Sequence, residues 1–153
     1  MYYAHIDNEN NIIDFSEAQY LNFINIQVTQ EQYELAQEKG NNYFIYSDGE
    51  LILNPNYEEE QEEKERERIG ELQITKRVFM LGLQQMGITY SQLKALIATN
   101  EQAQLEWDLC VELQRKNPLL DIMAAQLGVS SEMLDYIFRK ANGEDVDPPE
   151  SEE

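Results

Sequence analysis

Few residues of this sequence have side chains that enzymes use for nucleophilic, acid–base or metal chemistry. Among 153 residues there is one histidine, His5, and one cysteine, Cys110. His5 falls in a segment with strand-like alternation. Cys110 stands between Leu109 and Val111, which is typical of a buried and unreactive thiol. The sequence has no glycine-rich phosphate loop, G-x-S-x-G elbow or H-E-x-x-H motif. We therefore predict that the protein is not an enzyme and has no catalytic, cofactor-binding or metal-binding residues.

One short segment is similar to the start of a calcium-binding loop. It is Asp7-Asn8-Glu9-Asn10-Asn11, which is rich in oxygen ligands. The sharp-turn glycine of such loops is missing, and position 12 of the loop is Ala18 rather than glutamate. This segment therefore does not change the prediction that there is no metal site.

The charge of the chain excludes further classes of function. There are 30 acidic and 11 basic side chains, which give a net charge of −19. Binding to nucleic acid needs a basic face, so we expect no DNA or RNA partner.

One cysteine and one histidine cannot build a disulfide scaffold or a Cys/His zinc site. The N-terminus lacks the pattern of a signal peptide, and no segment approaches the ~20 apolar residues of a membrane span. We expect no membrane partner.

Residues 1–55 are predicted to form a small antiparallel β module. Alternating apolar residues and turn signals give the order strand–strand–strand–helix–strand–strand. Thr29 and Gln32 have the spacing of a capping box at the start of the helix, and Gly40 is placed to end it. Asp48-Gly49 between two apolar runs predicts a type I′ hairpin.

Tyrosines are concentrated in this N-terminal part of the chain. Seven of the nine fall within residues 1–57. Tyrosine is favoured at protein interfaces, and the partner-binding candidates are Tyr2, Tyr43, Tyr46 and Tyr57. The alternative is that these rings fill half-buried strand positions.

Residues 56–72 are predicted to form a charged connector helix. The segment is rich in glutamate and has no apolar heptad before Ile69, so it is not a coiled coil. We interpret it as a solvated spacer, and the alternative is a docking site for a basic partner.

Residues 73–142 carry no net charge and are predicted to form a helical bundle. One helix is expected over 75–86, a second begins near Thr89, and a longer one covers about 101–116 before Asn117-Pro118 breaks it. Two apolar stripes are expected on the long helix. They are Leu105, Leu109 and Leu113, and Ala103, Trp107 and Cys110.

The segment 119–138 has the pattern of a helix-turn-helix, with Gly128 at the turn. Its second helix carries Glu132 and Asp135, and its two bases, Arg139 and Lys140, stand at the far end. A recognition helix needs bases near the DNA and polar side chains at its N-terminal end. We therefore predict a hairpin used for packing, with DNA recognition as the alternative.

The last eleven residues, 143–153, hold six acids and no base, and we expect them to be disordered. The tail either keeps the chain in solution or acts as a docking tail or nucleic-acid mimic. The predicted fold class is thus α+β. It comprises a small antiparallel β module, a charged connector helix, a helical bundle with a helix-turn-helix-like hairpin, and a disordered acidic tail.

Several motifs together resemble a family of small phage proteins. They are the helix start over 26–33, the Asp-Gly hairpin with its following segment over 48–55, and the glutamate-rich helix. This combination resembles phage tail-fibre assembly proteins and other small proteins of phage and prophage tail clusters. The segments 74–78 and 117–121 resemble a C-terminal helical region of uncharacterised members of such clusters. The resemblance implies a phage tail or fibre protein as partner, and it supplies no catalytic or ligand residues.

The leading functional hypothesis is a non-enzymatic tail accessory or tail-fibre assembly protein that acts through protein–protein binding. It would work in the host cytoplasm during assembly, with or without remaining in the virion. The alternative is an acidic inhibitor of a host defence nuclease that mimics nucleic acid. A DNA-binding regulator is a third hypothesis, which depends only on the helix-turn-helix spacing. Homo-oligomerisation is left open.

Overall fold

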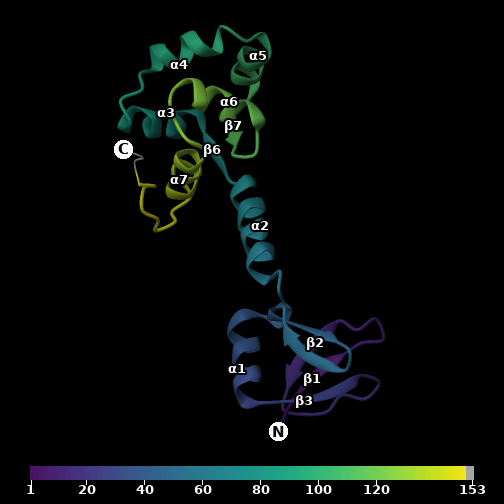
Figure 1. Cartoon of the computed structure of the whole chain (residues 1–153). Coiled ribbons are helices and arrows are strands. Elements are labelled where there is room, and N and C mark those ends of the chain that lie inside the picture. Colours follow the sequence, from purple (N-terminus) through teal and green to yellow (C-terminus); the bar gives the residue numbers. More distant parts are fainter. Residues whose placement is uncertain (151–153) are drawn as a thin grey trace. The chain divides into compact units, whose positions relative to one another are not determined.

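The computed structural model describes residues 1–150 and confirms the α+β class (Figure 1). The chain divides into two compact units, which we call the N-terminal unit, residues 1–62, and the C-terminal unit, from residue 63 onward. The boundary falls within helix α2 (Tyr57–Gly70), the charged helix expected from the sequence. Within residues 1–150, no helix is both long enough and apolar enough to cross a membrane.

The N-terminal unit has the expected order of strands and helix. An antiparallel sheet has the strand order β2-β1-β3, and β4 and β5 form a separate hairpin. In Figure 1, α1 lies along the three-stranded sheet. The elements are β1 (Tyr2–Ile6), β2 (Ile12–Ser16), β3 (Ile24–Val28), α1 (Gln30–Lys39), the short 3₁₀ helix Asn41–Tyr43, β4 (Phe44–Ser47) and β5 (Glu50–Leu53).

The turn and cap chemistry predicted for this unit is confirmed. Thr29 and Gln32 form both hydrogen bonds of a capping box, and Gly40 follows the helix with φ of 94°. Asp48 and Gly49 have φ of 52° and 89°, the two positive values that a type I′ turn requires. Ser47 and Glu50 therefore face each other at the end of the β4–β5 ladder.

The core of the N-terminal unit lies on one face of β1. Ala4 and Ile6 are fully buried there, together with Ala36 of α1 and Phe44 of β4. Since side chains alternate along a strand, His5 points to the opposite face, where it is also fully buried.

The C-terminal unit is a helical bundle with one small antiparallel pair of strands, β6 and β7. Its largest fully buried side chains are Leu83, Leu93, Leu120, Leu134 and Phe138. The elements are β6 (Gln73–Thr75), α3 (Lys76–Gln85), α4 (Tyr90–Ile97), α5 (Glu101–Leu109), β7 (Glu112–Gln114), α6 (Pro118–Gln126) and α7 (Ser131–Ala141).

The prediction of one long helix over 101–116 is wrong. Helix α5 ends at Leu109, Cys110 is extended, and residues 112–114 form β7 instead. The cause is a pairing with a distant segment, in which Leu113 lies opposite Ile74 of β6 and both side chains are buried. Leu113 thus belongs to the core, whereas Leu105 and Leu109 are left at the surface.

Helices α6 and α7 form the predicted hairpin. Asn117 caps α6 with Pro118 at its first turn, and Ser130 caps α7. Gly128 at the turn has φ of 73°, a conformation that favours glycine.

Arg115 joins this hairpin to the end of β7. Its side chain is 7% exposed, and its guanidinium group contacts Asp135 (Nε–Oδ1, 2.5 Å), Asp121 (Nη1–Oδ2, 3.0 Å) and the hydroxyl of Ser131 (Nη2–Oγ, 2.7 Å). Burial disfavours the charge on Arg115, but the hydrogen bond to Asp121 and the charge of Asp135 outweigh it, so the pKa of Arg115 is raised. One buried cation thereby holds β7, α6 and α7 together.

Helices α3 and α7 approach each other closely at Gly82. A Cβ atom at this position would lie 2.8 Å from Cγ2 of Ile137, which is closer than a side-chain contact allows. The glycine is therefore required by packing rather than by backbone conformation.

We predict that Gly82→Ala lowers the free energy of unfolding of the C-terminal unit. The clash with Ile137 should cost about 1–3 kcal/mol, more than the gain of up to about 1 kcal/mol in helix propensity. In an Ile137→Ala background the obstruction is gone, so the same Gly82→Ala change should be stabilising. Trp107 is the only tryptophan, and its fluorescence during urea unfolding reports on this unit. A destabilising effect of equal size in both backgrounds would contradict the contact.

We predict that Arg115→Met lowers the free energy of unfolding of the same unit by about 2–4 kcal/mol. The change leaves two carboxylates facing each other without their shared cation. Lys116→Met is the matched control, because Lys116 pairs with the exposed Glu71 and such surface pairs contribute about 0–1 kcal/mol. Urea unfolding followed by fluorescence measures both variants, and equal effects would refute the role of Arg115.

Candidate functional site

An open groove of about 1000 Å³ lies among α5, β7 and α6 of the C-terminal unit. It is the candidate functional site, because its walls are mainly apolar and its ends are open to solvent. Its apolar lining includes Leu105, Trp107, Leu109, Cys110, Leu119 and Leu120.

Two leucines of α5 are exposed at the groove. Leu105 is 57% exposed and Leu109 is 73% exposed, and they stand one helical turn apart. The next residue of the expected stripe, Leu113, lies in a strand, where it lines the groove as a buried side chain and adds nothing to the exposed ridge. A ridge of exposed leucine beside an apolar groove is a feature of interaction surfaces.

Trp107 lines the groove and is held by contacts with neighbouring residues. The Lys76 ammonium group donates to the Trp107 carbonyl oxygen at 2.6 Å and lies 5.6 Å from the centre of its ring. Cys110 Sγ lies 3.7 Å from the same carbonyl oxygen. These contacts hold the half-buried indole ring in place at the edge of the groove.

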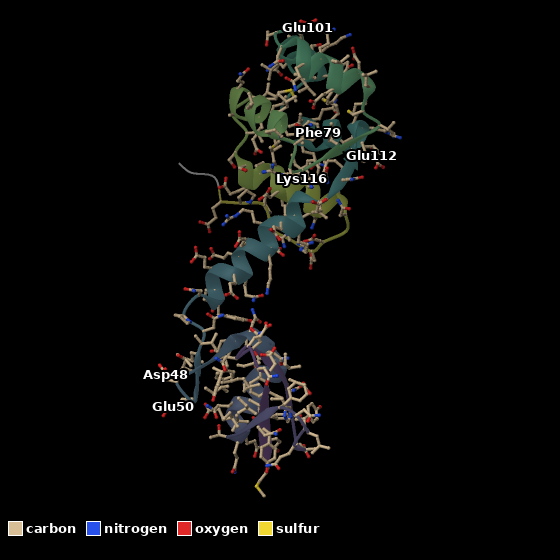
Figure 2. The ribbon with its side chains drawn as sticks, turned by 90° about the vertical axis from the view of Figure 1, so that its right-hand side faces the viewer. Asp48, Glu50, Phe79, Glu101, Glu112 and Lys116 are labelled. Atoms are coloured by element: carbon tan, nitrogen blue, oxygen red, sulfur yellow. The ribbon has the colours of Figure 1, made fainter. Side chains whose placement is uncertain are left out.

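Carboxylates border the groove. Glu106 and Glu112 line it, and within residues 1–150 neither of the two forms an ion pair. The one lining cation, Lys116, is already paired with Glu71. Figure 2 shows Glu101, Glu112 and Lys116 with the side chains of this unit. The groove therefore combines an apolar floor with an acidic rim.

The four candidate tyrosines lie in the N-terminal unit, apart from this groove in the sequence and in the division of the chain. Tyr2 stacks on Tyr33, with ring centres 4.4 Å apart, and Tyr43 meets the edge of Tyr57 at 4.9 Å. Tyr2, Tyr43 and Tyr46 pack against the core of the unit, and the Tyr57 hydroxyl donates to the Lys39 carbonyl oxygen. All four rings are half-buried.

Both ring nitrogens of His5 face hydrogen-bonding partners. Asn25 donates its amide to the Tyr20 and Phe23 carbonyl oxygens, so its Oδ1 faces His5 Nδ1, 2.7 Å away, and Nδ1 donates to it. His5 Nε2 lies 2.8 Å from Ser16 Oγ, and Tyr20 stacks on the ring at 3.8 Å. His5 thus anchors the segment between β2 and β3 over the second face of the sheet.

The calcium-like segment is a turn held by its own aspartate. Asp7 accepts hydrogen bonds from the backbone amides of Glu9 and Asn11, each at 2.8 Å, and from the Asn11 side chain. Its pKa is lowered, chiefly by the bond from the Asn11 backbone. Across the described part of the chain, no three His, Cys, Asp or Glu residues are placed to hold a metal together.

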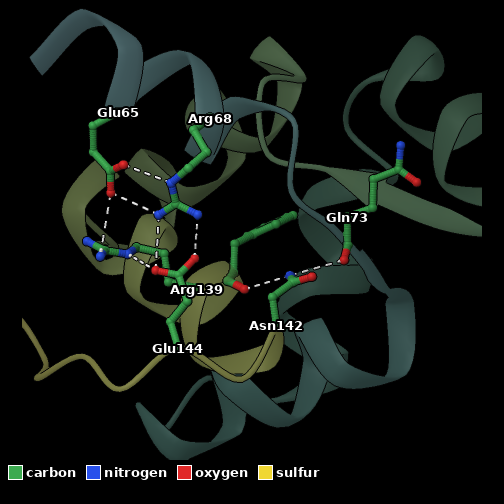
Figure 3. A network of polar contacts seen from close by, with 7 residues as sticks. Glu65, Arg68, Gln73, Arg139, Asn142 and Glu144 are labelled. Atoms are coloured by element: carbon green, nitrogen blue, oxygen red, sulfur yellow. Dashed lines mark hydrogen bonds and ion pairs between the residues drawn. The ribbon is translucent and has the colours of Figure 1, made fainter. Parts of the chain in front are cut away.

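The two bases of α7 are engaged by carboxylates, as Figure 3 shows for Arg139. Arg139 and Arg68 both pair with Glu144, and Glu65 completes the network. Lys140 lies 3.8 Å from Asp145. The first residues of the acidic tail are therefore anchored to α2 and α7 of the C-terminal unit. The prediction of disorder over 143–153 did not include these contacts. Residues 144–150 have no helix or strand, and 151–153 lie outside the described residues.

Comparisons with known proteins give no further guidance: no family model matches the chain, and neither does any curated protein or solved structure. Four of the lining residues were expected from the sequence to form apolar stripes on a longer helix. They are Leu105, Trp107, Leu109 and Cys110. The alternation of Leu113 with Glu112 and Gln114 is typical of a strand, but three residues are too few to outweigh the helical pattern of the segment before them.

We predict that Glu144 titrates with a pKa of about 2, well below its ordinary value of 4.5. The hydrogen bonds from Arg68 and then Arg139 favour its charged form. Because the folded-state pKa is depressed, the stabilisation is present above pH 4.5 and is lost as the pH falls towards 2. NMR titration of the side-chain carboxyl carbons measures the pKa. The variant Arg68→Gln should move it upward, whereas Lys140→Gln, which removes the pair with Asp145, should leave it unchanged. An ordinary pKa in the unmodified chain would contradict the network.

Proposed function

We propose that the chain is a non-enzymatic phage or prophage tail accessory protein that binds another tail or fibre protein. The observation that carries this proposal is the groove among α5, β7 and α6 with its exposed leucines. The resemblance of the turn and cap motifs to tail-fibre assembly proteins supplies the class of partner.

The exposure of the two leucines supports a binding role. Each would bury more than half of its side chain against a partner, at roughly 25 cal/mol for each Å² of apolar surface removed from water. The acidic rim would restrict the choice of partner through its charge. An apolar floor with a polar rim is the usual organisation of a protein–protein interface.

The two residues with the most reactive side chains are His5 and Cys110. His5 is fully buried with both ring nitrogens engaged, and Cys110 lies on the groove wall beside the Trp107 carbonyl oxygen. A general base or nucleophile needs access to a substrate. The burial of His5 supports a role in binding rather than in catalysis. Cys110 is half-buried and lines the open groove, so it is not the buried thiol expected from the sequence.

The experiment is affinity purification of the tagged full chain from cells that produce the phage, followed by mass spectrometry. We expect a tail, fibre or baseplate protein to be recovered with the unmodified chain. Its recovery should fall at least tenfold for Leu105→Ser/Leu109→Ser, because both substitutions remove apolar contact area. Leu81→Ser is the control, since Leu81 is exposed on α3 and does not line the groove. Recovery of no virion or fibre protein would overturn the proposal.

The second candidate is an inhibitor of a host defence nuclease that presents carboxylates in place of phosphates. It is favoured by the net charge of −19 and by the row of exposed acids on α2: Glu58, Glu59, Glu62, Glu63 and Glu67. Recovery of a nuclease in the same purification would favour this candidate. Such binding should be lost at ~0.5 M salt, where exposed charges are screened, so a complex that survives this salt would count against mimicry.

A further inference from the structure

We propose that the groove binds an amphipathic helix of a partner protein, with leucine-like side chains on one face and lysine or arginine on both flanks of that face. This inference rests on the proposed function and specifies the chemistry of the partner.

The shape of the groove favours a helix. Leu105 and Leu109 form a ridge with i, i+4 spacing on α5, the row that packs between the side chains of a second helix. The lining residues run from Gln102 to Leu109 on α5 and from Pro118 to Met123 on α6, so the two walls extend over about 10 Å and about 8 Å at 1.5 Å per residue. The groove can therefore contact about two turns of a bound helix.

The charges around the groove determine which side chains the flanks of the bound helix must carry. Glu106 and Glu112 line the groove, and the described residues provide no cation partner for either. Glu106 does accept a hydrogen bond from the Asn117 amide at 2.8 Å, which holds its carboxylate in place. The acidic rim of the groove thus consists of Glu106 at α5 and Glu112 at β7. A complementary partner must place positive side chains opposite this rim.

A second copy of the chain is a poor occupant. In a symmetric dimer the same surface of each copy meets its counterpart, so two acidic rims would be brought together. The net charge of −19 adds long-range repulsion between copies. The occupant expected from the charge is therefore a different protein with a basic segment.

The test uses two synthetic peptides of 18 residues, each with leucines along one face of a helix. One has lysines on the flanks of that face and the other has glutamates at the same positions. The full chain is titrated with each peptide, and Trp107 in the groove provides an intrinsic fluorescence signal. We expect the lysine peptide to bind at least tenfold more tightly than the glutamate peptide at low salt.

Three variants separate groove binding from general attraction to an acidic protein. Leu105→Ser/Leu109→Ser should weaken binding of the lysine peptide at least tenfold. Glu106→Gln/Glu112→Gln should weaken it about three- to tenfold, and this difference should vanish at ~0.5 M salt. Glu62→Gln/Glu63→Gln removes the same charge from α2, outside the groove, and should change the affinity less than twofold.

Three results would overturn the inference. They are equal binding of the two peptides, an equal loss of affinity in the α2 control, and self-association of the chain that Leu105→Ser/Leu109→Ser abolishes. The proposed function fails separately, when no tail or fibre protein is purified with the chain. If a tail protein is recovered in a groove-dependent way but cross-links to the groove through a segment without basic residues, the inference fails and the proposed function stands.

Discussion

The C-terminal unit depends on the burial of one cation, Arg115. A guanidinium group removed from water needs several acceptors in a fixed arrangement, and here they come from α6 and α7. The residues before Arg115 run as a strand along β6, and the Arg115 amide donates to the Leu72 carbonyl oxygen, so this pairing brings Arg115 to the two helices. Asp121 and Asp135 keep about a third or more of their side chains exposed, so their own desolvation is partial. This arrangement ends α5 at Leu109 and opens the groove beside it.

The N-terminal unit could be predicted from the sequence because its determinants are local. The capping box of α1 and the type I′ turn at Asp48-Gly49 join residues no more than three apart, so their spacing in the sequence is also their spacing in the structure. Strand alternation was visible in the sequence around His5, and it agrees with Ala4 and Ile6 on one face of β1. It could not show what covers the other face, because Ser16, Tyr20 and Asn25 reach His5 from outside its strand. The sequence predicted His5 as an ordinary strand residue, and the structure adds that it anchors the following segment.

The groove could not be predicted because it depends on a non-local contact. β7 has three residues, too few for a clear period of two, and helix propensity over 101–116 favoured continuation. The strand forms because it pairs with β6, 39 residues earlier at Ile74 and Leu113. The apolar stripe of the expected helix is thereby divided, so that Leu113 enters the core and Leu105 and Leu109 remain exposed. The lining residues were recognised as apolar from the sequence, but only the tertiary pairing makes them a surface.

The distribution of basic side chains explains why charge should select the partner. Within residues 1–150, six of the eleven bases are held in ion pairs: Lys39, Arg68, Arg115, Lys116, Arg139 and Lys140. Lys76, which lies over Trp107, donates to a carbonyl oxygen. Most of the bases are thus engaged by acceptors of the chain itself, whereas the carboxylates that line the groove have no cation partner among the described residues. A basic partner is steered towards this field, and copies of the chain repel one another. Since long-range charge interactions govern encounter and buried apolar area governs how long a complex lasts, the acidic rim should set the association rate and the exposed leucines the dissociation rate.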